Sequence, residues 1–273
     1  TKFEELHILK PGISWSPDGE KIVFSAKSGE ADALFILNII TNKTEKINLD
    51  LEGIFQPIWN PNHKNTEIAF IGNNGKNADI YIYNYETKDL INITNDWFSD
   101  SDVSWSITGD ELYFISNRGE YNFTNNTVDF EFLYESSFNV NNKDIYKITK
   151  THRKVERITN TTFNESYPTE LNDGKSIVFL SDESGINNLY IMKNNDSYPI
   201  TNTITGITQF SLDKNNNQIL FSGLENLGYN IYSILEPLRL MSDKNSIPIS
   251  SWKKEDLSYN FIERDSDNNG EYI

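Results

Sequence analysis

Short apolar runs alternate with polar turns along most of this chain, and the alternation repeats. Each repeat starts with an apolar run that often ends on tryptophan. A polar turn follows, and then a β-branched and aromatic run that closes on phenylalanine. The closing positions lie 46, 44, 65 and 42 residues apart, at Phe24, Phe70, Phe114, Phe179 and Phe221. A period of about 40–45 residues is typical of the four-stranded blades of a β-propeller.

Each repeat holds four segments with the composition of β-strands. In the best-preserved copy, residues 16–20 read SPDGE, where proline fixes φ and Asp-Gly supplies the turn chemistry. The third segment starts on a carboxylate or amide that can accept hydrogen bonds from nearby backbone N–H groups, as at Asp79, Asp144, Asn188 and Asn230. The fourth segment ends as Ile-Thr-Asn at 93–95, 158–160 and 200–202.

These segments predict an all-β fold. We expect a β-propeller of four-stranded blades, with five complete blades in this chain plus a partial sixth, and assign residues 11–237 to it. Residues 1–10 are expected to be the outer strand of a partial blade, because propellers commonly close by combining strands from both termini. Residues 238–273 lack the repeat and are rich in charges and amides, so we expect a C-terminal tail or linker.

The chain departs from the repeat at two places, and each departure leads to a prediction. The tryptophan position of the fourth copy holds Glu170, and because burying a lone carboxylate is costly we expect it to be exposed at a strand end. The third copy has about twenty extra residues between Gly119 and Asp144, with aromatic residues next to Asp129 and Glu131. Insertions in repeat proteins map to loops on one face, often the binding face.

The net charge of the chain restricts the classes of molecule that it could bind. Forty acidic and 24 basic residues give a net charge of −16, which disfavours binding to nucleic acid or to an anionic membrane surface. No run is long and apolar enough for a membrane-spanning helix, so we expect no direct membrane insertion of this segment. The absence of cysteine excludes disulfides and thiolate metal sites.

The combination of SWSPDGEKIVF at 14–24 with the Asp-Ile-Tyr and Ile-Thr-Asn strands resembles the TolB-type WD40-like β-propeller repeat family. The resemblance covers residues 11–235. It implies a bacterial cell-envelope protein, periplasmic or in another envelope compartment, whose propeller docks other proteins such as a peptidoglycan-associated lipoprotein. Similar propellers also occur within longer envelope proteins, some ending in an outer-membrane barrel, and in prolyl-oligopeptidase-like hydrolases.

Catalytic and cofactor motifs are missing from the sequence. There is no G-x-S-x-G nucleophile elbow, and the histidines are far apart, at His7, His63 and His152. We therefore expect no enzyme activity, no cofactor and no catalytic residue in this segment. The tail spacing of Asp265, Asp267 and Asn269 matches the first half of a calcium loop, but the chain ends before the bidentate glutamate. We interpret it as a solvated acidic linker and predict no metal site.

The geometry of a propeller predicts one binding face. Loops that join one blade's outer strand to the next blade's inner strand lie on the same face as loops between second and third strands. This face should carry aromatic anchors inside a charged rim, which is typical of protein interfaces. The expected partner-binding residues are Phe55, Asp96, Trp97, Phe98, Asp100, Asp102, Phe163 and Glu165. The other interpretation is that the aromatic side chains fold inward and pack between blades.

The sequence thus favours a non-catalytic propeller scaffold that binds a protein or peptide partner, either an envelope lipoprotein or a neighbouring domain, through an acidic, aromatic-bearing loop face. The first alternative is an accessory propeller domain of a larger hydrolase or outer-membrane protein whose activity lies outside this chain. The second is a propeller that binds a small ligand or metal in its central channel, which would require a polar channel lined by carboxylates.

Overall fold

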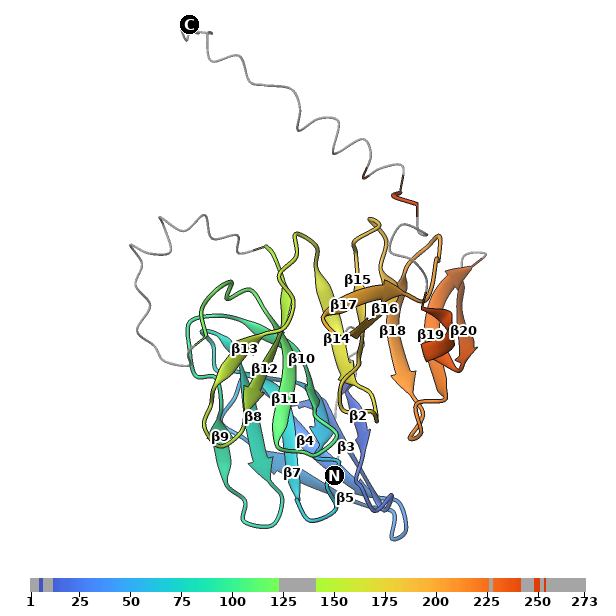
Figure 1. Ribbon diagram of the computed structural model, residues 1–273. Coiled ribbons are helices and arrows are strands. Elements are labelled where there is room, and N and C mark those ends of the chain that lie inside the picture. The colour runs from blue at the N-terminus through green and yellow to red at the C-terminus, as the bar shows by residue number, and fades with distance from the viewer. Residues whose placement is uncertain are drawn as a thin grey trace, which may run out of the picture.

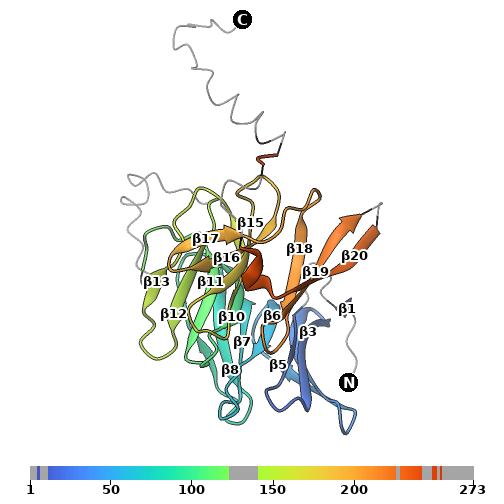
Figure 2. The ribbon, with the colours of Figure 1, turned by 45° about the vertical axis from the view of Figure 1, so that its right-hand side comes forward.

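The computed structural model describes residues 5–6, 12–122, 141–225, 228–241, 248–250 and 253. Its strands form five antiparallel sheets that follow one another in chain order, from the blue end to the red end of Figures 1 and 2. The five-bladed, all-β propeller predicted from the repeat is therefore confirmed. The expected insertion residues 123–140 and the calcium-like tail lie outside the described residues.

The blades have the following strands. The first contains β1 (Glu5–Leu6), β2 (Ile13–Trp15), β3 (Lys21–Ser28), β4 (Ala31–Asn38) and β5 (Lys43–Asn48). The second contains β6 (Gly53–Trp59), β7 (Glu67–Asn73), β8 (Ala78–Asn84) and β9 (Leu90–Asn92). The third contains β10 (Asp100–Trp105), β11 (Glu111–Ser116), β12 (Asp144–Thr149) and β13 (Val155–Arg157). The fourth contains β14 (Glu165–Glu170), β15 (Ile177–Ser181), β16 (Asn188–Lys193) and β17 (Asp196–Pro199).

The fifth blade has three strands among the described residues, β18 (Ile207–Leu212), β19 (Gln218–Glu225) and β20 (Gly228–Leu235), and the short 3-10 helix η1 (Pro237–Leu240) follows. The outermost strand, β20, is largely exposed: Ile231 is 79% exposed, and Tyr229 and Leu235 are also exposed. This edge is unpaired within the described part of the chain, and an unpaired apolar edge is a template for further strand pairing.

The N-terminal segment lies in the first blade. Glu5 and Leu6 of β1 pair with Lys27 and Ala26 of β3, while β2 pairs with the earlier part of the same strand. β1 and β2 therefore occupy one edge of β3, as two pieces of an inner strand. The described residues show no partial sixth blade, and the strand expected in residues 1–10 contributes to the first sheet instead.

Hydrophobic side chains pack between consecutive blades. Four core clusters join the first blade to the second, the second to the third, the third to the fourth and the fourth to the fifth. In each blade the closing phenylalanine lies next to an aromatic residue of the third strand. These pairs are Phe24–Phe35, Phe70–Tyr81, Phe114–Tyr146, Phe179–Tyr190 and Phe221–Tyr232. The repeated phenylalanine is thus a packing residue of each blade.

The predicted role of the third-strand carboxylate or amide is confirmed in three blades. The backbone N–H groups of Asp96, Thr161 and Thr203 donate to the side chains of Asp79, Asp144 and Asn188, respectively. The neighbouring threonine of the Ile-Thr-Asn segment accepts a hydrogen bond from the third strand in the same blades, through Thr94, Thr159 and Thr201. The sequence motifs therefore fix where each interblade loop leaves the sheet.

Glu170 does lie at the end of β14, but it is only half-exposed and it has partners. Its carboxylate accepts hydrogen bonds from the Tyr113 hydroxyl at 2.9 Å and from the backbone N–H of Ile107 at 2.8 Å. The side chain replaces the packing of a tryptophan with a polar link to the preceding blade. Hydrogen bonding offsets the cost of taking the carboxylate partly out of water.

Candidate partner-binding face

The candidate site is the face formed by the loops between blades and by the connections between second and third strands. We call it the loop face and define it by residues 93–99, 117–122, 141–143, 158–164 and 182–187. The predicted partner-binding residues lie on or beneath this face, and the structure separates them by depth.

A buried arginine organises the loop face between the second and third blades. The Arg118 side chain is fully buried, and it donates to Asp96 Oδ2 at 2.9 Å and to Asp100 Oδ1 at 2.8 Å. Its Nε donates to the Ser116 hydroxyl at 3.0 Å. Because this arginine fixes both ends of the loop 96–100, the loop is held against the start of the third blade.

Aromatic rings surround the same guanidinium. The Arg118 Cζ atom lies 5.5 Å from the ring centroid of Phe98, 5.1 Å from that of Phe114 and 5.7 Å from that of Tyr146. Guanidinium groups are attracted to aromatic faces, and more strongly where water is excluded. We call Arg118, its two carboxylates and these three rings the filled box.

The charges of the filled box do not cancel, since one guanidinium faces two carboxylates. Burial raises the pKa of Asp96, while Arg118 opposes the rise and Asp100 adds to it. For Arg118 itself, burial alone would lower the pKa, but the two carboxylates outweigh it and the pKa is raised. The guanidinium therefore stays charged, and the Asp96 carboxyl takes up a proton more readily than an ordinary aspartate does.

Trp97 lies above this box and is the exposed part of the loop. It is 44% exposed, whereas its neighbour Phe98 is 2% exposed. The two rings meet edge to face, with centroids 5.9 Å apart. An exposed aromatic side chain supported by a buried one loses little conformational freedom on binding.

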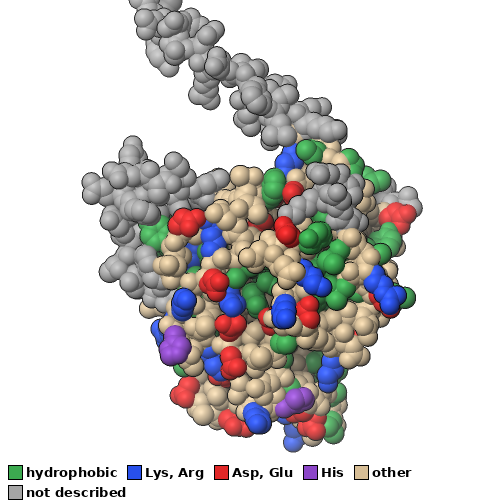
Figure 3. Space-filling model, in the orientation of Figure 1, with side chains coloured by type: hydrophobic (Ala, Val, Ile, Leu, Met, Phe, Trp, Pro, Cys, Tyr) green, Lys and Arg blue, Asp and Glu red, His purple; other side chains and the backbone are tan. Residues whose placement is uncertain are grey.

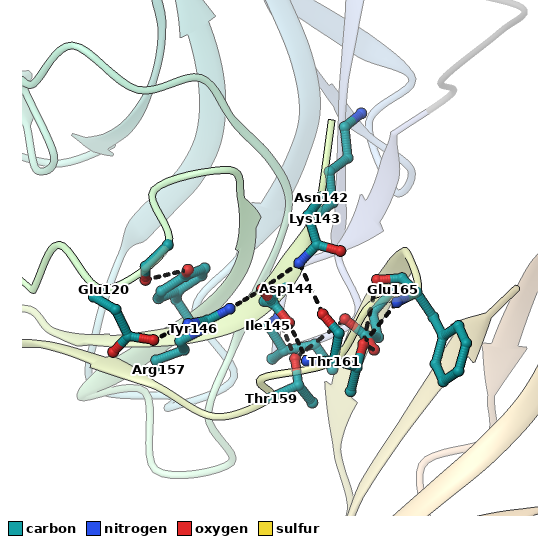
Figure 4. A network of polar contacts seen from close by, with 12 residues as sticks. Glu120, Asn142, Lys143, Asp144, Ile145, Tyr146, Arg157, Thr159, Thr161 and Glu165 are labelled. Atoms are coloured by element: carbon teal, nitrogen blue, oxygen red, sulfur yellow. Dashed lines mark hydrogen bonds and ion pairs between the residues drawn. The ribbon is translucent and has the colours of Figure 1, made fainter. Parts of the chain in front are cut away.

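A second polar network lies between the third and fourth blades (Figure 4). Arg157, at the end of β13, bridges Glu120 and Asp144, and its Nη2 lies 2.6 Å from Asp144 Oδ2. The same carboxylate accepts hydrogen bonds from Asn142 Nδ2 at 2.9 Å and from the backbone N–H of Thr161 at 3.1 Å. Asp144 therefore joins the strand connection at 141–143 to the interblade loop.

Glu165 lies next to this network, and the described part of the chain pairs it with no cation. It is buried, and its two oxygens accept hydrogen bonds from the hydroxyls of Thr161 at 2.7 Å and Thr159 at 3.2 Å. Burial raises the pKa of Glu165 to about 8, against the effect of the Thr161 hydroxyl, and the nearby Asp144 adds to the rise. The side chain is therefore largely protonated at neutral pH.

Glu165 should make stability depend on pH. Its raised pKa means that the folded protein holds a proton between about pH 4.5 and 8 that the unfolded chain releases, so this contribution is fully present below pH 4.5 and is lost as pH rises through about 8. In Glu165→Gln the amide stays neutral, so the free energy of unfolding of the variant should gain on wild type by about 1 kcal/mol per pH unit over this range. Urea denaturation of both proteins at pH 5, 6.5 and 8 measures the difference. The control is Glu86→Gln at an exposed turn, and parallel curves for wild type and Glu165→Gln would contradict the assignment.

The remaining predicted residues also divide into buried and partly buried side chains. Asp102 is buried in the β-bulge of β10, where its backbone has a φ of 51° and its carboxylate accepts a 3.0 Å hydrogen bond from Gln56 of the preceding blade. Phe55 is partly buried against the core between the second and third blades. Phe163 is partly buried, and the Lys253 ammonium lies 4.4 Å from its ring centroid.

The structure thus corrects the expected surface. Five of the eight predicted residues are buried, and they stabilise the loops from inside: Asp96, Phe98, Asp100, Asp102 and Glu165. The inward-packing interpretation holds for Phe98, while Trp97 stays exposed. An acidic rim made of these carboxylates is not formed, because their charges point into the protein.

Sequence reasoning missed the two arginines, Arg118 and Arg157, that organise the face. Arg118 follows the second strand of the third repeat, and Arg157 precedes its Ile-Thr-Asn segment. For Arg118, a basic residue at a repeat position where the other copies have none was the available signal. The alignment of Asn74, Arg118 and Glu183 in successive copies shows this difference.

On the face seen in Figure 3, basic and acidic side chains are interspersed, and hydrophobic side chains gather at the upper right. Among the described residues there is no group of three or more His, Asp or Glu side chains placed to hold a metal ion. No described helix has the length and apolar character needed to cross a membrane.

Comparison with known proteins supports the resemblance noted from the repeats. No protein-family model matches the chain. The Tol-Pal system protein TolB of Francisella tularensis subsp. holarctica (strain OSU18) is 28% identical over 201 residues, which are 73% of this chain and 41% of that protein. The TolB of Ruthia magnifica subsp. Calyptogena magnifica is 36% identical over 91 residues, 32% of this chain and 21% of that protein. The chain spans about two fifths of the length of the first of these relatives.

Solved structures share the fold. TolB from Acinetobacter baumannii has a TM-score of 0.63 at 19% identity, covering 85% of this chain and 54% of that one. A putative TolB from Agrobacterium tumefaciens has a TM-score of 0.64 at 15% identity, covering 84% and 78%. An oligogalacturonate lyase in complex with manganese also matches, with a TM-score of 0.57 at 13% identity over 84% of this chain and 65% of that one. The fold is therefore shared by proteins with different functions.

Proposed function

The chain is a β-propeller of the TolB type, and on that premise we propose that it binds a protein or peptide partner through its loop face in the bacterial cell envelope. The observation that carries the proposal is Trp97, an exposed aromatic side chain supported by the buried ring of Phe98 on a loop fixed by Arg118. Tryptophan is enriched among the residues that contribute most to protein interfaces. The function is non-catalytic.

The partner class follows from the relatives. They are named as Tol-Pal system proteins, so the peptidoglycan-associated lipoprotein of the same organism is the first partner to test. Lipoprotein binding is proposed for the propeller segment alone, since the chain spans only part of these relatives. The alternative, an accessory propeller of a larger hydrolase or outer-membrane protein, is favoured by no specific contact in the described residues.

Binding can be tested with two matched tryptophan variants. Trp97→Ala should weaken binding of the soluble lipoprotein domain about tenfold or more, since truncating a central interface aromatic typically costs more than about 1.4 kcal/mol. Trp15→Ala is the control, because Trp15 is also exposed but lies at the end of β2, at the opposite end of its blade from the loop face. Isothermal titration calorimetry measures both. Equal loss in the two variants, or no binding by the wild-type propeller, would contradict the proposal.

A further inference from the structure

A cavity of about 180 Å³ lies between the third and fourth blades, next to Glu165. Its walls include the rings of Phe163, Phe179 and Tyr190, and its polar lining includes Glu165, Ser181 and Glu183. At its rim Asn195 is exposed and Phe163 is partly exposed. The cavity is therefore a small chamber with aromatic walls and carboxyl groups that opens toward solvent.

This cavity occupies the same place in its blade as the filled box does in the preceding one. In the third blade Asp100 pairs with Ser116, and in the fourth Glu165 pairs with Ser181. Glu165 therefore stands at the position of Asp100. Strand register thus gives a residue-by-residue correspondence between the two sites.

The aromatic walls correspond as well. Phe114 is paired with Tyr146 across β11 and β12, and Phe179 is paired with Tyr190 across β15 and β16. The ring centroids are 5.8 Å apart in the first pair and 5.9 Å apart in the second. The third wall is the phenylalanine two residues before the inner strand, Phe98 in one blade and Phe163 in the other.

Two members of the box differ. Four residues before the inner strand the third blade has Asp96, whereas the fourth has Thr161. Two residues after Ser116 the chain has Arg118, whose guanidinium fills the third-blade box, but two residues after Ser181 it has Glu183. The fourth blade thus keeps the aromatic walls and one of the two buried carboxyl groups, and an acidic side chain replaces the cation. Among the described residues no ion pair reaches Glu165, so the counter-charge that the third blade supplies internally is missing here.

The chain also places a cation at the rim of the cavity. The Lys253 ammonium lies 4.4 Å from the ring centroid of Phe163 and donates to the backbone carbonyl oxygens of Glu183 at 2.7 Å and Asp182 at 3.3 Å. The rim therefore accepts a positive group in two ways, through an aromatic face and through carbonyl oxygens. This observation is independent of the comparison between blades.

We propose that this cavity binds the guanidinium group of an arginine side chain presented by a protein or peptide partner. The Glu165 carboxyl releases its proton when the guanidinium enters and then supplies the anion. Phe163, Phe179 and Tyr190 supply the stacking surfaces, as their counterparts do around Arg118. Guanidinium fits better than ammonium because it is planar, weakly hydrated and stacks on aromatic rings. The inference rests on the proposed function, since it names the chemistry of the partner's contact.

The test uses a probe that needs no partner protein. N-acetyl-arginine-N-methylamide should bind the full chain and shift the methyl and aromatic NMR signals of the cavity, whereas the citrulline analogue, which has the same shape without charge, should not. Glu165→Gln keeps the side-chain shape and should weaken probe binding at least tenfold above about pH 8, where the wild-type carboxyl is ionised. Citrulline binding as tightly as arginine, or Glu165→Gln binding like wild type, would overturn the proposal, and equal binding of the lysine analogue would overturn the assignment to guanidinium.

A variant that fills the cavity with an arginine side chain provides a second test. Glu183→Arg places an arginine where the third blade has Arg118, so it should abolish probe binding and raise the thermal midpoint. Glu86→Arg makes the same charge change at an exposed turn and should leave probe binding intact. If Glu183→Arg still binds the probe as wild type does, the cavity is not the site.

The two proposals can fail separately. Probe binding without capture of the lipoprotein would support the pocket and contradict the proposed partner. Capture of the lipoprotein without probe binding would support the partner and contradict the pocket. Lys253→Ala should leave probe binding equal to or tighter than that of wild type, because it removes a cation from the rim. A loss of probe binding in this variant would contradict a site that accepts an external cation.

Discussion

Arg118→Met should lower the free energy of unfolding by about 3–5 kcal/mol, because it leaves Asp96 and Asp100 buried without their cation. At roughly 2–4 °C per kcal/mol for a chain of this size, the thermal midpoint should fall by about 6–20 °C. Methionine preserves much of the side-chain volume, so the loss reports the charge rather than an empty cavity. Differential scanning calorimetry or urea denaturation measures the change.

A charge-matched variant distinguishes an unpaired carboxylate from lost packing. Adding Asp96→Asn and Asp100→Asn to Arg118→Met removes all three charges and should restore most of the stability, since uncharged replacements of buried ion pairs are often nearly neutral. The control for a surface arginine is Arg239→Met, whose pair with Glu236 is exposed and should contribute less than about 1 kcal/mol. A loss in Arg118→Met no larger than in Arg239→Met would contradict the role given to the buried box.

Substitution of two adjacent aromatic residues on the loop face should lower stability by very different amounts. Phe98→Ala should cost about 3–5 kcal/mol, because it removes a buried ring that contacts both Arg118 and Tyr121. Trp97→Ala should cost only about 1 kcal/mol, because nearly half of the side chain already faces solvent. Thermal denaturation separates the two.

The pair also separates stability from binding. Trp97→Ala is the variant for partner assays, because its fold should be nearly intact. A loss of binding in Phe98→Ala could come either from a lost contact with the partner or from a disrupted fold. Similar stability losses in both variants would show that the loop does not divide into a buried and an exposed side chain. The two residues are adjacent in sequence and both are aromatic, so only the path of the loop decides which side chain is buried.

Much of the fold could be predicted from the sequence because each blade repeats the same local chemistry. The turn residues, the strand-closing phenylalanines and the third-strand carboxylates all act within one blade, over short sequence distances. The first blade shows the limit of this reasoning. Its N-terminal segment pairs with β3, and no local pattern in residues 1–10 distinguishes that pairing from a strand of a separate blade.

The site was harder to predict because its contacts join different blades. Whether Asp96 and Asp100 point to solvent or inward depends on Arg118, which lies 18 residues from Asp100 and 22 from Asp96. Carboxylates near aromatic residues in a loop predict a charged rim, because charged side chains are mostly exposed. The single arginine that changes this interpretation comes from the far end of the next strand pair.

The two boxes also give the molecule an internal standard. One chain holds an arginine-filled box and a cavity with the same aromatic walls, in the same buffer, at the same salt and temperature. Any medium effect on guanidinium–aromatic attraction therefore acts on both sites.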